Sequence, residues 1–480
     1  MSRCRLDKYY KKKFFRHGKN LPIRNTMDTK ALRQKILDLA IHGKLVPQDP
    51  NDEPASVLLQ RIREEKERLV KEGKIKKGKK AKSSDAAHYE NVPFEIPKSW
   101  EWCKLGDYVS SVTDGDHQAP PKAATGIPFL VISNLTDGIL DFNNTRHVPQ
   151  TYYDSIQFER KAQKGDILFT VTGSYGIVVK VNTNEPFCFQ RHIGLIKPMN
   201  DNVCDYLTYI LRSKYIKKLC DELATGTAQK TVGLDTLRSF YIPIPPLAEQ
   251  NRIVSEIERW FSLIDIIESR KENLKSAVQQ AKAKILDLAI HGKLVPQNPT
   301  DEPASELLRR INPKAEITSD DAQYGKVPQG WCVCDFKCIF SDISSKPYQI
   351  LQSQIKSKGK HPVVSQSSNF IEGYSDESNF YKINTPIVIF GDHTRNVKFI
   401  DFDFIVGADG VKIIKPLCNA KFCYYLVLFA SCHIKNKGYS RHFSQISNFK
   451  YPLPPLAEQH RIVAKIEQLF VRLDRIEAKL

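Results

Sequence analysis

Several short motifs of this 480-residue chain contain residue types used in catalysis, but each lacks a part that its chemistry needs. Methyl transfer to adenine requires a glycine-rich cofactor turn and an Asn/Asp-Pro-Pro-aromatic motif, whereas the Pro-Pro pairs here stand in IPPL and LPPL. No G-x-x-x-x-G-K-S/T phosphate loop occurs. Ser174 in TGSYG lacks the first glycine of a nucleophile elbow, and Asp409 and Lys412 are too far apart for a D/E-x-K nuclease site. We predict that the chain has no catalytic residue and is not an enzyme.

The groups that could hold a metal ion lack the spacing of a ligand set. Cys332, Cys334 and Cys338 form the densest cysteine group, but they contain no C-x-x-C knuckle, and alternating cysteines are more typical of one face of a strand. The acids and the histidine of DGDHQAPP (114–121) could bind a metal, but the segment is foremost a turn-rich loop whose polar groups could equally contact bases. We predict no metal site.

Polar side chains of the kind that read nucleic-acid bases gather in two separate parts of the chain. Arg, Lys, Asn, Gln and small hydroxyl side chains on loops and strand ends make such contacts. Any one of them is more typical of an ordinary exposed loop, so the hypothesis concerns the groups. The first group is Thr172, Ser174, Tyr175, Gln190, Arg191, His192, Gln229 and Lys230. The second group is Lys360, Ser365, Gln366, Ser368, Asn369, His393, Thr394, Arg395, Asn396, Arg441 and His442.

The formal net charge of +18 supports nucleic-acid binding only weakly, because most of it lies in two segments. Residues 1–26 contribute +8 and residues 61–83 contribute +7, and such runs are most often solvated flanks. Residues 93–245 hold 16 basic and 16 acidic side chains, whereas residues 325–451 hold 16 and 9. A positively charged face in residues 93–245 therefore requires that the basic and acidic side chains lie on different sides of the folded region.

The overall composition indicates a chain outside membranes. No stretch approaches the roughly 18 consecutive apolar residues of a membrane span. The basic first residues lack the apolar segment of a secretory signal. The 11 cysteines are irregularly spaced, which is typical of reduced thiols and favours a cytoplasmic location.

Two regions, about 90–242 and 324–450, contain the candidate reading residues and read as strands joined by tight turns. Runs such as IPFLVISNL (127–135) and GDILFTVTGSYGIVVKV (165–181) combine β-branched and aromatic residues with Gly, Asn and Asp. Short helices are predicted at 203–219 and 420–436. The two regions barely resemble each other.

Two duplicated sequence blocks flank these two regions. KILDLAIHGKLVPQDPNDEPASVLLQRI (35–62) recurs at 284–311 with four differences over 28 positions. PIPPLAEQNRIVSEIERWFSLID (243–265) returns at 452–474 as PLPPLAEQHRIVAKIEQLFVRLD. The two blocks run together in the middle of the chain but are split between its ends. Joining residue 480 to residue 28 would regenerate the central order, so the layout is cyclic with an approximate two-fold.

The central block predicts one long helix with an apolar stripe that alternates by four and three residues. We expect the terminal copies to lie antiparallel on this stripe; the alternative is a coiled coil that dimerises two chains. The predicted helix-packing residues are Ile253, Ile257, Trp260, Ile264, Ile267, Leu274, Val278, Ile285, Leu288, Ile462, Ile466, Leu469, Leu473 and Ile476.

The paired PPLAEQ-x-RIV helices, the duplicated ILDLAIHGKLVPQ-x-P-x-DEPAS block and the two unlike regions between them resemble the specificity (S) subunit of type I restriction–modification systems. The resemblance covers about Asp28 to Leu480. It implies two target recognition domains that each read one half of a split DNA sequence. It also implies partner methyltransferase (M) and restriction (R) subunits, with S-adenosylmethionine, ATP and Mg expected on those partners and no cofactor in this chain.

The predicted fold class is therefore α/β (mixed α+β), with two globular target recognition domains separated by long antiparallel coiled-coil helices in a pseudo-two-fold cyclic arrangement. The alternatives are a coiled-coil adaptor that binds only proteins and a stand-alone endonuclease. The predicted domains are a basic extension and candidate for disorder (1–26), an N-terminal conserved helical segment (27–62), a basic linker (63–89), target recognition domain 1 (90–242), a central conserved helical region (243–312), target recognition domain 2 (324–451) and a C-terminal conserved helix (452–480).

Overall fold

The computed structural model describes residues 28–75, 93–115, 117, 120–136, 138–200, 203–227, 229–318, 320–321, 324–407, 409–436, 438 and 440–480. The chain divides into two compact units. The N-terminal unit is Met27–Glu268, and the described residues of the C-terminal unit all lie in Ser269–Leu480. The predicted extension 1–26 and most of the predicted linker, 76–89, lie outside the described residues. Within the described part, no helix combines the length and the apolar character needed to span a bilayer.

The N-terminal unit combines a pair of long helices with a globular head, which we call head 1 (residues 93–242). Its helices are α2 (Thr29–Ile41), α3 (Ala55–Lys71), α4 (Leu105–Tyr108), α5 (Gln150–Ser155), α6 (Cys204–Leu211), α7 (Lys214–Leu223), α8 (Leu234–Ser239) and the first part of α9 (Leu247–Ile290), with 3₁₀ turns η2 (Ile132–Asn134) and η3 (Phe158–Arg160). Its strands are β1 (Glu101–Lys104), β2 (Val109–Asp114), β3 (Ile127–Leu130), β4 (Leu135–Thr136), β5 (Ile139–Leu140), β6 (Arg146–Val148), β7 (Ile167–Thr170), β8 (Val178–Lys180), β9 (Cys188–Phe189), β10 (Ile193–Pro198) and β11 (Tyr241–Ile244).

The C-terminal unit has the same plan, with head 2 (residues 324–451). Its helices are the rest of α9, α10 (Ala304–Ile311), α11 (Phe336–Ile339), α12 (Ala420–His433), α13 (Phe443–Ser447) and α14 (Leu456–Glu477), with 3₁₀ turns η5 (Lys346–Tyr348) and η6 (Gln352–Gln354). Its strands are β12 (Asp320–Asp321), β13 (Gly325–Lys326), β14 (Cys332–Asp335), β15 (Phe340–Ile343), β16 (Gln349–Ile350), β17 (His361–Val364), β18 (Gly373–Ser375), β19 (Ile387–Gly391), β20 (Val397–Ile400), β21 (Ile405–Gly407), β22 (Val411–Pro416) and β23 (Lys450–Leu453).

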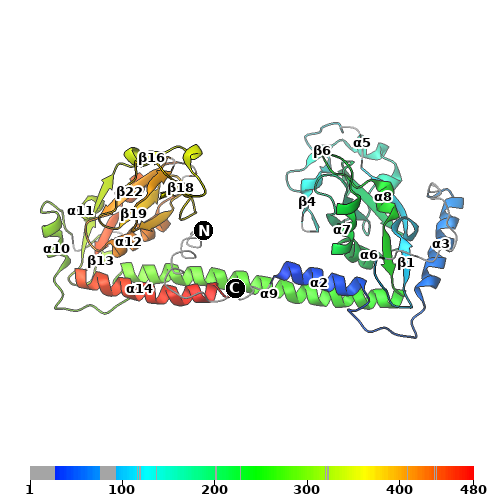
Figure 1. Ribbon diagram of the computed structural model, residues 1–480, viewed down its shortest axis with the longest axis horizontal. Helices are drawn as coiled ribbons and strands as arrows, with labels where there is room; N and C mark the ends of the chain where they lie inside the picture. The colour runs from blue at the N-terminus through cyan, green and yellow to red at the C-terminus, as the bar shows by residue number, and fades with distance from the viewer. Residues whose placement is uncertain are drawn as a thin grey trace. The chain divides into compact units, whose positions relative to one another are not determined.

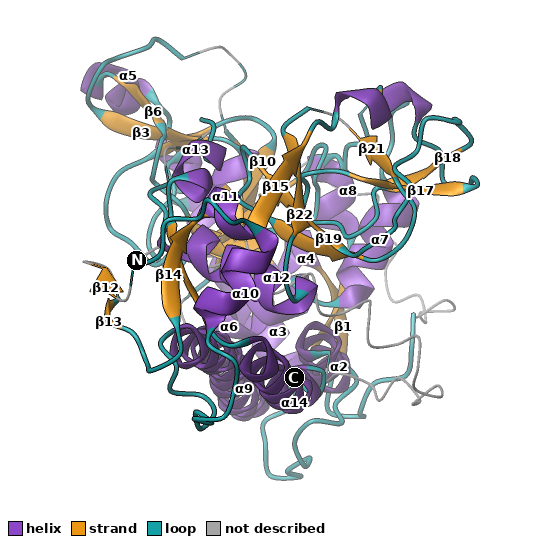
Figure 2. Cartoon of the chain, turned by 90° about the vertical axis from the view of Figure 1, so that its left-hand side faces the viewer, coloured by secondary structure: helices purple, strands orange, loops and turns teal. Residues whose placement is uncertain are grey.

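Each head is built on an antiparallel four-stranded sheet, in the order β2-β10-β7-β8 in head 1 and β15-β22-β19-β20 in head 2. Figure 2 shows β15, β22 and β19 side by side, with α12 next to them. All four residues of β7 and all five of β19 are buried, because each sheet carries apolar cores on both faces. A second sheet adds to each head: β6-β3-β9 in head 1 and β16-β21-β17-β18 in head 2.

In each unit the chain enters and leaves the head through two adjacent antiparallel strands. β1 pairs with β11, with Glu101 opposite Ile244, and β14 pairs with β23, with Cys332 opposite Leu453. The long helices begin just after the second strand of each pair. We refer to the long helices and the loops that join them as the frame.

The frame helices of the N-terminal unit are antiparallel (Figure 1). Arg33 on α2 binds Asp265 at 2.6 Å, whereas Gln48, beyond the end of α2, binds Glu249 at 2.6 Å near the start of α9. The residue numbers of the contacts therefore increase along α2 and the loop after it while they decrease along α9, which is the antiparallel pattern. α2 starts at the Asp28 side chain, which accepts a hydrogen bond from the Ala31 amide at 2.9 Å.

The C-terminal unit repeats this arrangement with α14 against the second part of α9 (Figure 1). The Lys282 ammonium lies 2.7 Å from Asp474 and 3.0 Å from Glu477, and Lys282 is buried. Near the other end of α14, Arg461 binds Asp301 at 2.7 Å. A buried ammonium with two carboxylate partners fixes the register of these helices, because an unpaired buried charge is strongly disfavoured.

The predicted packing stripe needs correction at three positions. Ile253, Ile257, Ile264, Val278, Ile462 and Ile466 are buried, and Ile267, Ile285, Leu288, Leu469 and Leu473 are half-buried. Trp260, Leu274 and Ile476 are exposed, at 37%, 42% and 42%. Phe261 packs in place of Trp260, against Tyr209 and below the Arg33 guanidinium. A straight helix has 3.6 residues per turn and drifts away from a 3.5-residue stripe, which shifts the contact to a neighbouring position.

The predicted basic linker 63–89 begins as a helix, as expected of a basic segment in which a helix trails into a linker. α3 continues to Lys71, and the Lys66 ammonium donates hydrogen bonds to the carbonyls of Gly106 (2.5 Å) and Val109 (2.8 Å). These bonds tie the extended helix to head 1. The helix predicted at 203–219 is two helices, α6 and α7, because the Ser213 side chain caps a new start by accepting from the Ile216 amide at 3.4 Å.

Candidate nucleic-acid interface

Loops from separate parts of head 1 meet at one end of its four-stranded sheet. Asp114 at the end of β2 lies opposite Gly194, and Thr170 at the end of β7 lies opposite Ile193. The hairpin loop 171–177, the turn 190–192 and the loop 225–231 leave the sheet there or pack against it. The sheet thus gathers all of the reading residues predicted for this region.

The hairpin loop of head 1 is held by backbone bonds to the loop 225–231. The Gly173 amide donates to the Lys230 carbonyl at 3.0 Å, and the Thr231 hydroxyl lies 3.2 Å from that of Thr172. Gly173 has φ +69°, and a Cβ there would lie 2.9 Å from the Gln229 amide nitrogen. Ser174, Gln229 and Lys230 are exposed, whereas Thr172 is buried, so its predicted role in DNA contact is replaced by a structural one.

Tyr175 faces α7. Its hydroxyl donates to the Asp221 carboxylate at 2.9 Å, and the Lys217 ammonium lies 4.0 Å from the centre of its ring. The hydrogen bond to Asp221 raises the pKa of Tyr175 and lowers that of Asp221. The side chain is therefore ordered by contacts within the head, and the exposed part of its ring remains available at the loop.

The turn Gln190–His192 lies beside the hairpin loop. The Val171 amide donates to the His192 carbonyl at 2.9 Å, and the Gln190 amide donates to the Leu130 carbonyl at 3.1 Å. Arg191 at the tip of the turn is exposed, and Gln190 and His192 are half-buried. The turn therefore presents one exposed cation between two partly covered polar groups.

In head 2 a single residue, Gln366, organises the corresponding sheet end. Its side-chain oxygen accepts from the His393 amide at 3.1 Å, and its side-chain nitrogen donates to the Asp409 carbonyl at 2.9 Å. Its backbone carbonyl accepts from the Thr394 hydroxyl at 2.6 Å and from the Asn396 side chain at 2.9 Å. Three loops thus meet at one residue, and four predicted reading residues lie together.

Asp392 holds the loop before α13 against the same sheet end. Its carboxylate accepts from the backbone amides of His442 at 2.8 Å and Phe443 at 2.7 Å. His442 is fully buried, and its ring lies 2.9 Å from the Asp392 carbonyl, so we correct its predicted DNA contact to a structural role. Arg441, one residue earlier, is exposed, and Arg395 has φ +57° at the tip of the hairpin.

A buried lysine anchors the loop 365–369. The Lys398 ammonium donates to the carbonyls of Ser365 at 2.6 Å and Asn369 at 2.5 Å, and burial lowers the pKa of Lys398 to about 8. Ser365 is itself buried, which corrects its predicted exposure, whereas Asn369 is exposed and Ser368 is half-buried.

Lys360 is the predicted residue that the structure separates from its group. It precedes β17, whereas Ser365 and Gln366 follow that strand, and its amide donates to Asp376 at 3.0 Å. A four-residue strand spans about 13 Å, so Lys360 lies at the other end of the second sheet.

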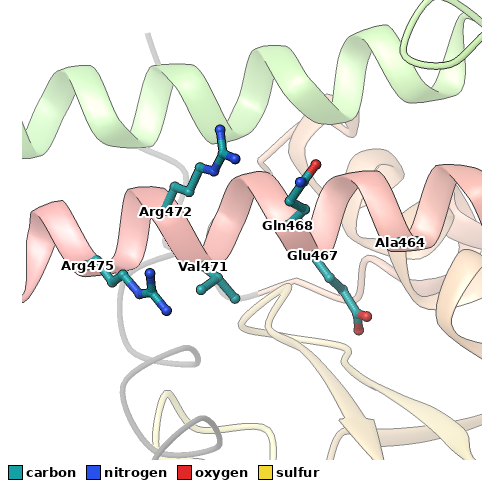
Figure 3. Close-up of a pocket in the computed structure, with 6 residues that line it drawn as sticks. All are labelled: Ala464, Glu467, Gln468, Val471, Arg472 and Arg475. Carbon is teal, nitrogen blue, oxygen red and sulfur yellow. The ribbon is translucent and has the colours of Figure 1, made fainter.

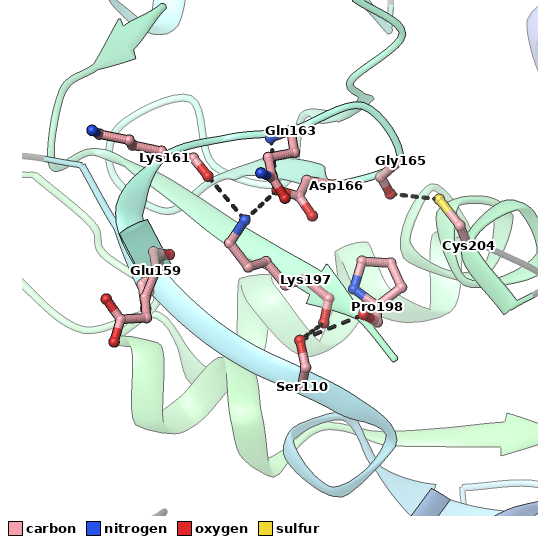
Figure 4. A network of polar contacts seen from close by, with 10 residues as sticks. Ser110, Glu159, Lys161, Gln163, Gly165, Asp166, Lys197, Pro198 and Cys204 are labelled. Atoms are coloured by element: carbon pink, nitrogen blue, oxygen red, sulfur yellow. Dashed lines mark hydrogen bonds and ion pairs between the residues drawn. The ribbon is translucent and has the colours of Figure 1, made fainter. Parts of the chain in front are cut away.

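Sequence reasoning missed three polar groups: Lys398 and Asp392, which hold the loops of head 2, and the pair Lys197–Asp166, which holds the segment before β7 in head 1. Lys197 donates to Asp166 at 2.6 Å and to the Lys161 carbonyl at 2.9 Å, with the two side chains only 13% and 10% exposed (Figure 4). Each partner is distant in sequence, and no spacing pattern identifies such a pair. A charged residue inside an otherwise apolar strand, such as Lys398 in VKFI, is a sequence signal for a buried polar contact.

The frame carries a shallow hollow of about 480 Å³ on α14, away from these loops (Figure 3). The described residues that line it are Ala464, Glu467, Gln468, Val471, Arg472 and Arg475. They belong to one helix face, and none of the predicted reading residues is among them.

Known proteins resemble this chain along most of its length. The family model described as type I restriction modification DNA specificity domain matches residues 97–276 and 339–480. The chain is 27% identical over 549 residues to the specificity subunit of the Escherichia coli type I restriction enzyme EcoAI, covering 93% of this chain and 90% of that protein. It is 30% identical over 381 residues to the EcoEI specificity subunit of Escherichia coli, covering 66% and 62%.

A solved structure shares the fold. It comes from work on complex assembly and conformational transition of the type I restriction–modification system, and it aligns with a TM-score of 0.50 at 18% identity. The alignment covers 80% of this chain and 97% of the solved one.

Proposed function

The chain belongs to the family of type I restriction–modification DNA specificity subunits, and from this premise we propose that its two heads each read one half of a bipartite DNA target. It is a DNA sequence-specificity subunit, and the catalytic activity lies with partner methyltransferase and restriction subunits. We assign the reading surface of each head to the loops at the end of its four-stranded sheet. Adenine N6-methylation and ATP-dependent cleavage by the partners would follow from that recognition.

The observation that carries this proposal is the contrast between similar frames and unlike loop ends. In head 1, Ser174, Arg191, Gln229 and Lys230 are exposed at the sheet end. In head 2, Gln366, Thr394, Asn396 and Arg441 occupy that place through different bonds. Arg and Gln can donate to base edges in the major groove, and two unlike sets of donors suit two unlike short sequences.

Exposed apolar side chains on the frame support binding of partner subunits. Trp260, Leu263 and Ile266 on α9 are 37%, 41% and 45% exposed, although the same helix buries its other face against α2. Adjacent exposed apolar side chains favour a protein–protein interface. S-adenosylmethionine, ATP and Mg belong to the partners in this proposal, and we place the assembly in the cytoplasm with its DNA.

The direct test is selection from a pool of random duplexes. The full chain, assembled with its methyltransferase subunits and S-adenosylmethionine, is expected to enrich and methylate one motif of two short halves with a fixed gap. An uninterrupted motif, or no motif, would contradict the proposal.

The gap itself gives a first quantitative prediction. Seven helical residues inserted between Glu268 and Ser269 leave the contacts of Arg33 and Lys282 intact and add about 10 Å to α9. We expect the selected gap to lengthen by about three base pairs, because B-DNA rises about 3.4 Å per base pair. The same seven residues inserted after Asn144, in an exposed turn of head 1, should leave the gap unchanged.

A further inference from the structure

Head 1 contains an arginine held by a buried carboxylate. Asp114 ends β2, and one of its carboxylate oxygens lies 2.9 Å from the Arg160 guanidinium while the other lies 2.8 Å from His117 Nε2. The side chains of Asp114, Arg160 and His117 are 12%, 34% and 56% exposed. The carboxylate is therefore covered, and both of its partners keep surface that another molecule can reach.

The backbone on both sides of Arg160 is fixed. The Thr113 hydroxyl donates to the Glu159 carbonyl at 3.2 Å. On the other side, Lys197 donates to the Lys161 carbonyl, and the Asp166 carboxylate that Lys197 binds also accepts from the Gln163 amide at 2.8 Å (Figure 4). The segment that carries Arg160 is thus tied to β2 and β10 by partly buried polar bonds, so little order has to be created when it binds a ligand.

This group lies at the reading end of head 1. The Gly115 amide, directly after Asp114, donates to the Ile193 carbonyl at 3.3 Å. A Cβ at Gly115 would lie 2.0 Å from the Phe189 carbonyl oxygen, so the backbone here packs directly on the turn that presents Gln190 and Arg191. Arg160 and that turn are therefore parts of one surface.

The chemistry of the pair suits base recognition. Only one terminal guanidinium nitrogen of Arg160 is hydrogen-bonded to Asp114, which leaves further N–H donors in a planar fork. Such a fork matches the O6 and N7 acceptors of guanine in the major groove. A carboxylate that holds the fork in one orientation limits it to one base position, whereas a free lysine or arginine could follow any phosphate.

We propose that Arg160 is a specificity-determining residue of head 1 that reads a guanine in one half of the DNA target, with Asp114 as its positioning residue. The inference rests on the proposed function, because it takes head 1 to read one half of the motif. His117 is the neighbouring polar group, on the other oxygen of the same carboxylate.

The experiment repeats the duplex selection with the assembled complex and four variants. Arg160→Gln removes the fork and the charge, Arg160→Lys keeps the charge, and Asp114→Asn keeps the shape of the positioning group. Lys164→Gln is the matched control, since it removes a positive charge from an exposed side chain of the same segment. Thermal unfolding of each complex identifies variants that fold.

Arg160→Gln is expected to reduce the preference for one G·C pair in one half of the motif by about five- to one-hundred-fold. Arg160→Lys should relax the same position with a smaller loss of total affinity, and Asp114→Asn should relax it less. Lys164→Gln should weaken binding equally for all sequences or leave it unchanged. A merely structural role for Arg160 would lower affinity without changing the base preference at one position.

The outcomes separate this inference from the function on which it rests. A two-part motif that stays unchanged, or loses affinity uniformly, in both Arg160 variants overturns the inference alone. If Arg160→Gln does not fold, Arg160→Lys decides by the same criterion. An unchanged preference in Asp114→Asn overturns the positioning role. If the unaltered complex selects no two-part motif, the proposed function itself fails.

Discussion

The two units of this chain have nearly the same frame and clearly different heads. In the N-terminal unit the Glu249 carboxylate accepts from Trp100 at 2.9 Å and from Gln48 at 2.6 Å. In the C-terminal unit Glu458 accepts from Trp331 at 2.9 Å and from Gln297 at 3.1 Å. We call these two arrangements the joints. The two copies of this buried joint agree down to single hydrogen bonds.

The heads differ in the way their loops are held. The hairpin loop of head 1 relies on backbone bonds to a neighbouring loop, whereas that of head 2 relies on the side chain and the backbone carbonyl of Gln366. Strand registers place Val179 of β8 where β20 has Lys398, since their partners Leu168 and Ile389 occupy matching positions in the sheets. One head thus has an apolar contact where the other has a buried ammonium. The heads therefore stabilise their loops in different ways on frames of the same design.

The strongest test of the shared frame removes the tryptophan of each joint. Trp100→Ala and Trp331→Ala should each lower the free energy of unfolding of their own unit by about 3–5 kcal/mol, because each leaves a cavity. The carboxylate of the joint also loses one of its two N–H donors and keeps the glutamine. Urea unfolding followed by hydrogen exchange on peptides of each unit measures the effect.

Trp260→Ala is the matched control for these variants. Its side chain is 37% exposed and lies beside the Arg259 guanidinium, so we expect a loss below about 1 kcal/mol. A large loss for one joint tryptophan and a small loss for the other would show that the two joints are not equivalent.

A smaller effect should separate the heads. Lys398→Met leaves the carbonyls of Ser365 and Asn369 without their donor, which should cost head 2 about 1–3 kcal/mol and speed hydrogen exchange at 365–369. The folded-state pKa of Lys398, about 8, is below its ordinary value of 10.5, so the unfolded chain binds more protons between these values. Stability should therefore rise with pH from 8 to 10.5 through this group, and the variant should lack that contribution.

The control for this experiment is Lys415→Met, on the exposed face of β22. It removes the same charge and should change stability by less than about 0.5 kcal/mol. Equal effects of the two substitutions would mean that the contacts of Lys398 add nothing to head 2.

The smallest expected effect concerns pH and should be the same in both units. Burial raises the pKa of Glu249 and of Glu458 above the ordinary value of 4.5. The folded chain then holds these protons to higher pH than the unfolded chain, so the free energy of unfolding should fall as pH rises from about 4.5 through the raised pKa. Glu249→Gln and Glu458→Gln should each remove part of this slope, measured by urea unfolding from pH 4 to 7.

Glu185→Gln, at an exposed position, is the control for the general effect of removing a negative charge. Slopes of opposite sign in the two joint variants would break the equivalence of the frames. Slopes of the same sign and similar size would extend that equivalence from geometry to electrostatics.

Sequence patterns predicted the frame better than the reading surface. Pro-Pro pairs precede α9 at Leu247 and α14 at Leu456, and the strands predicted in 165–181 are β7 and β8. Local signals of this kind depend on neighbouring residues. The burial of Thr172, Ser365 and His442 and the pairing of Asp114 with Arg160 depend on partners tens of residues away. A single sequence does not encode those distances in its spacing.

The pairing of β1 with β11 and of β14 with β23 has a consequence for how such a chain can change. The first and last strands of each head are hydrogen-bonded neighbours, so the chain enters and leaves a head at one place even though the head also packs on the long helices. Its interior can gain strands, lose loops or be exchanged entirely, provided that the two ends still meet side by side. The interior of a head can therefore change while the long helices and the joints stay as they are.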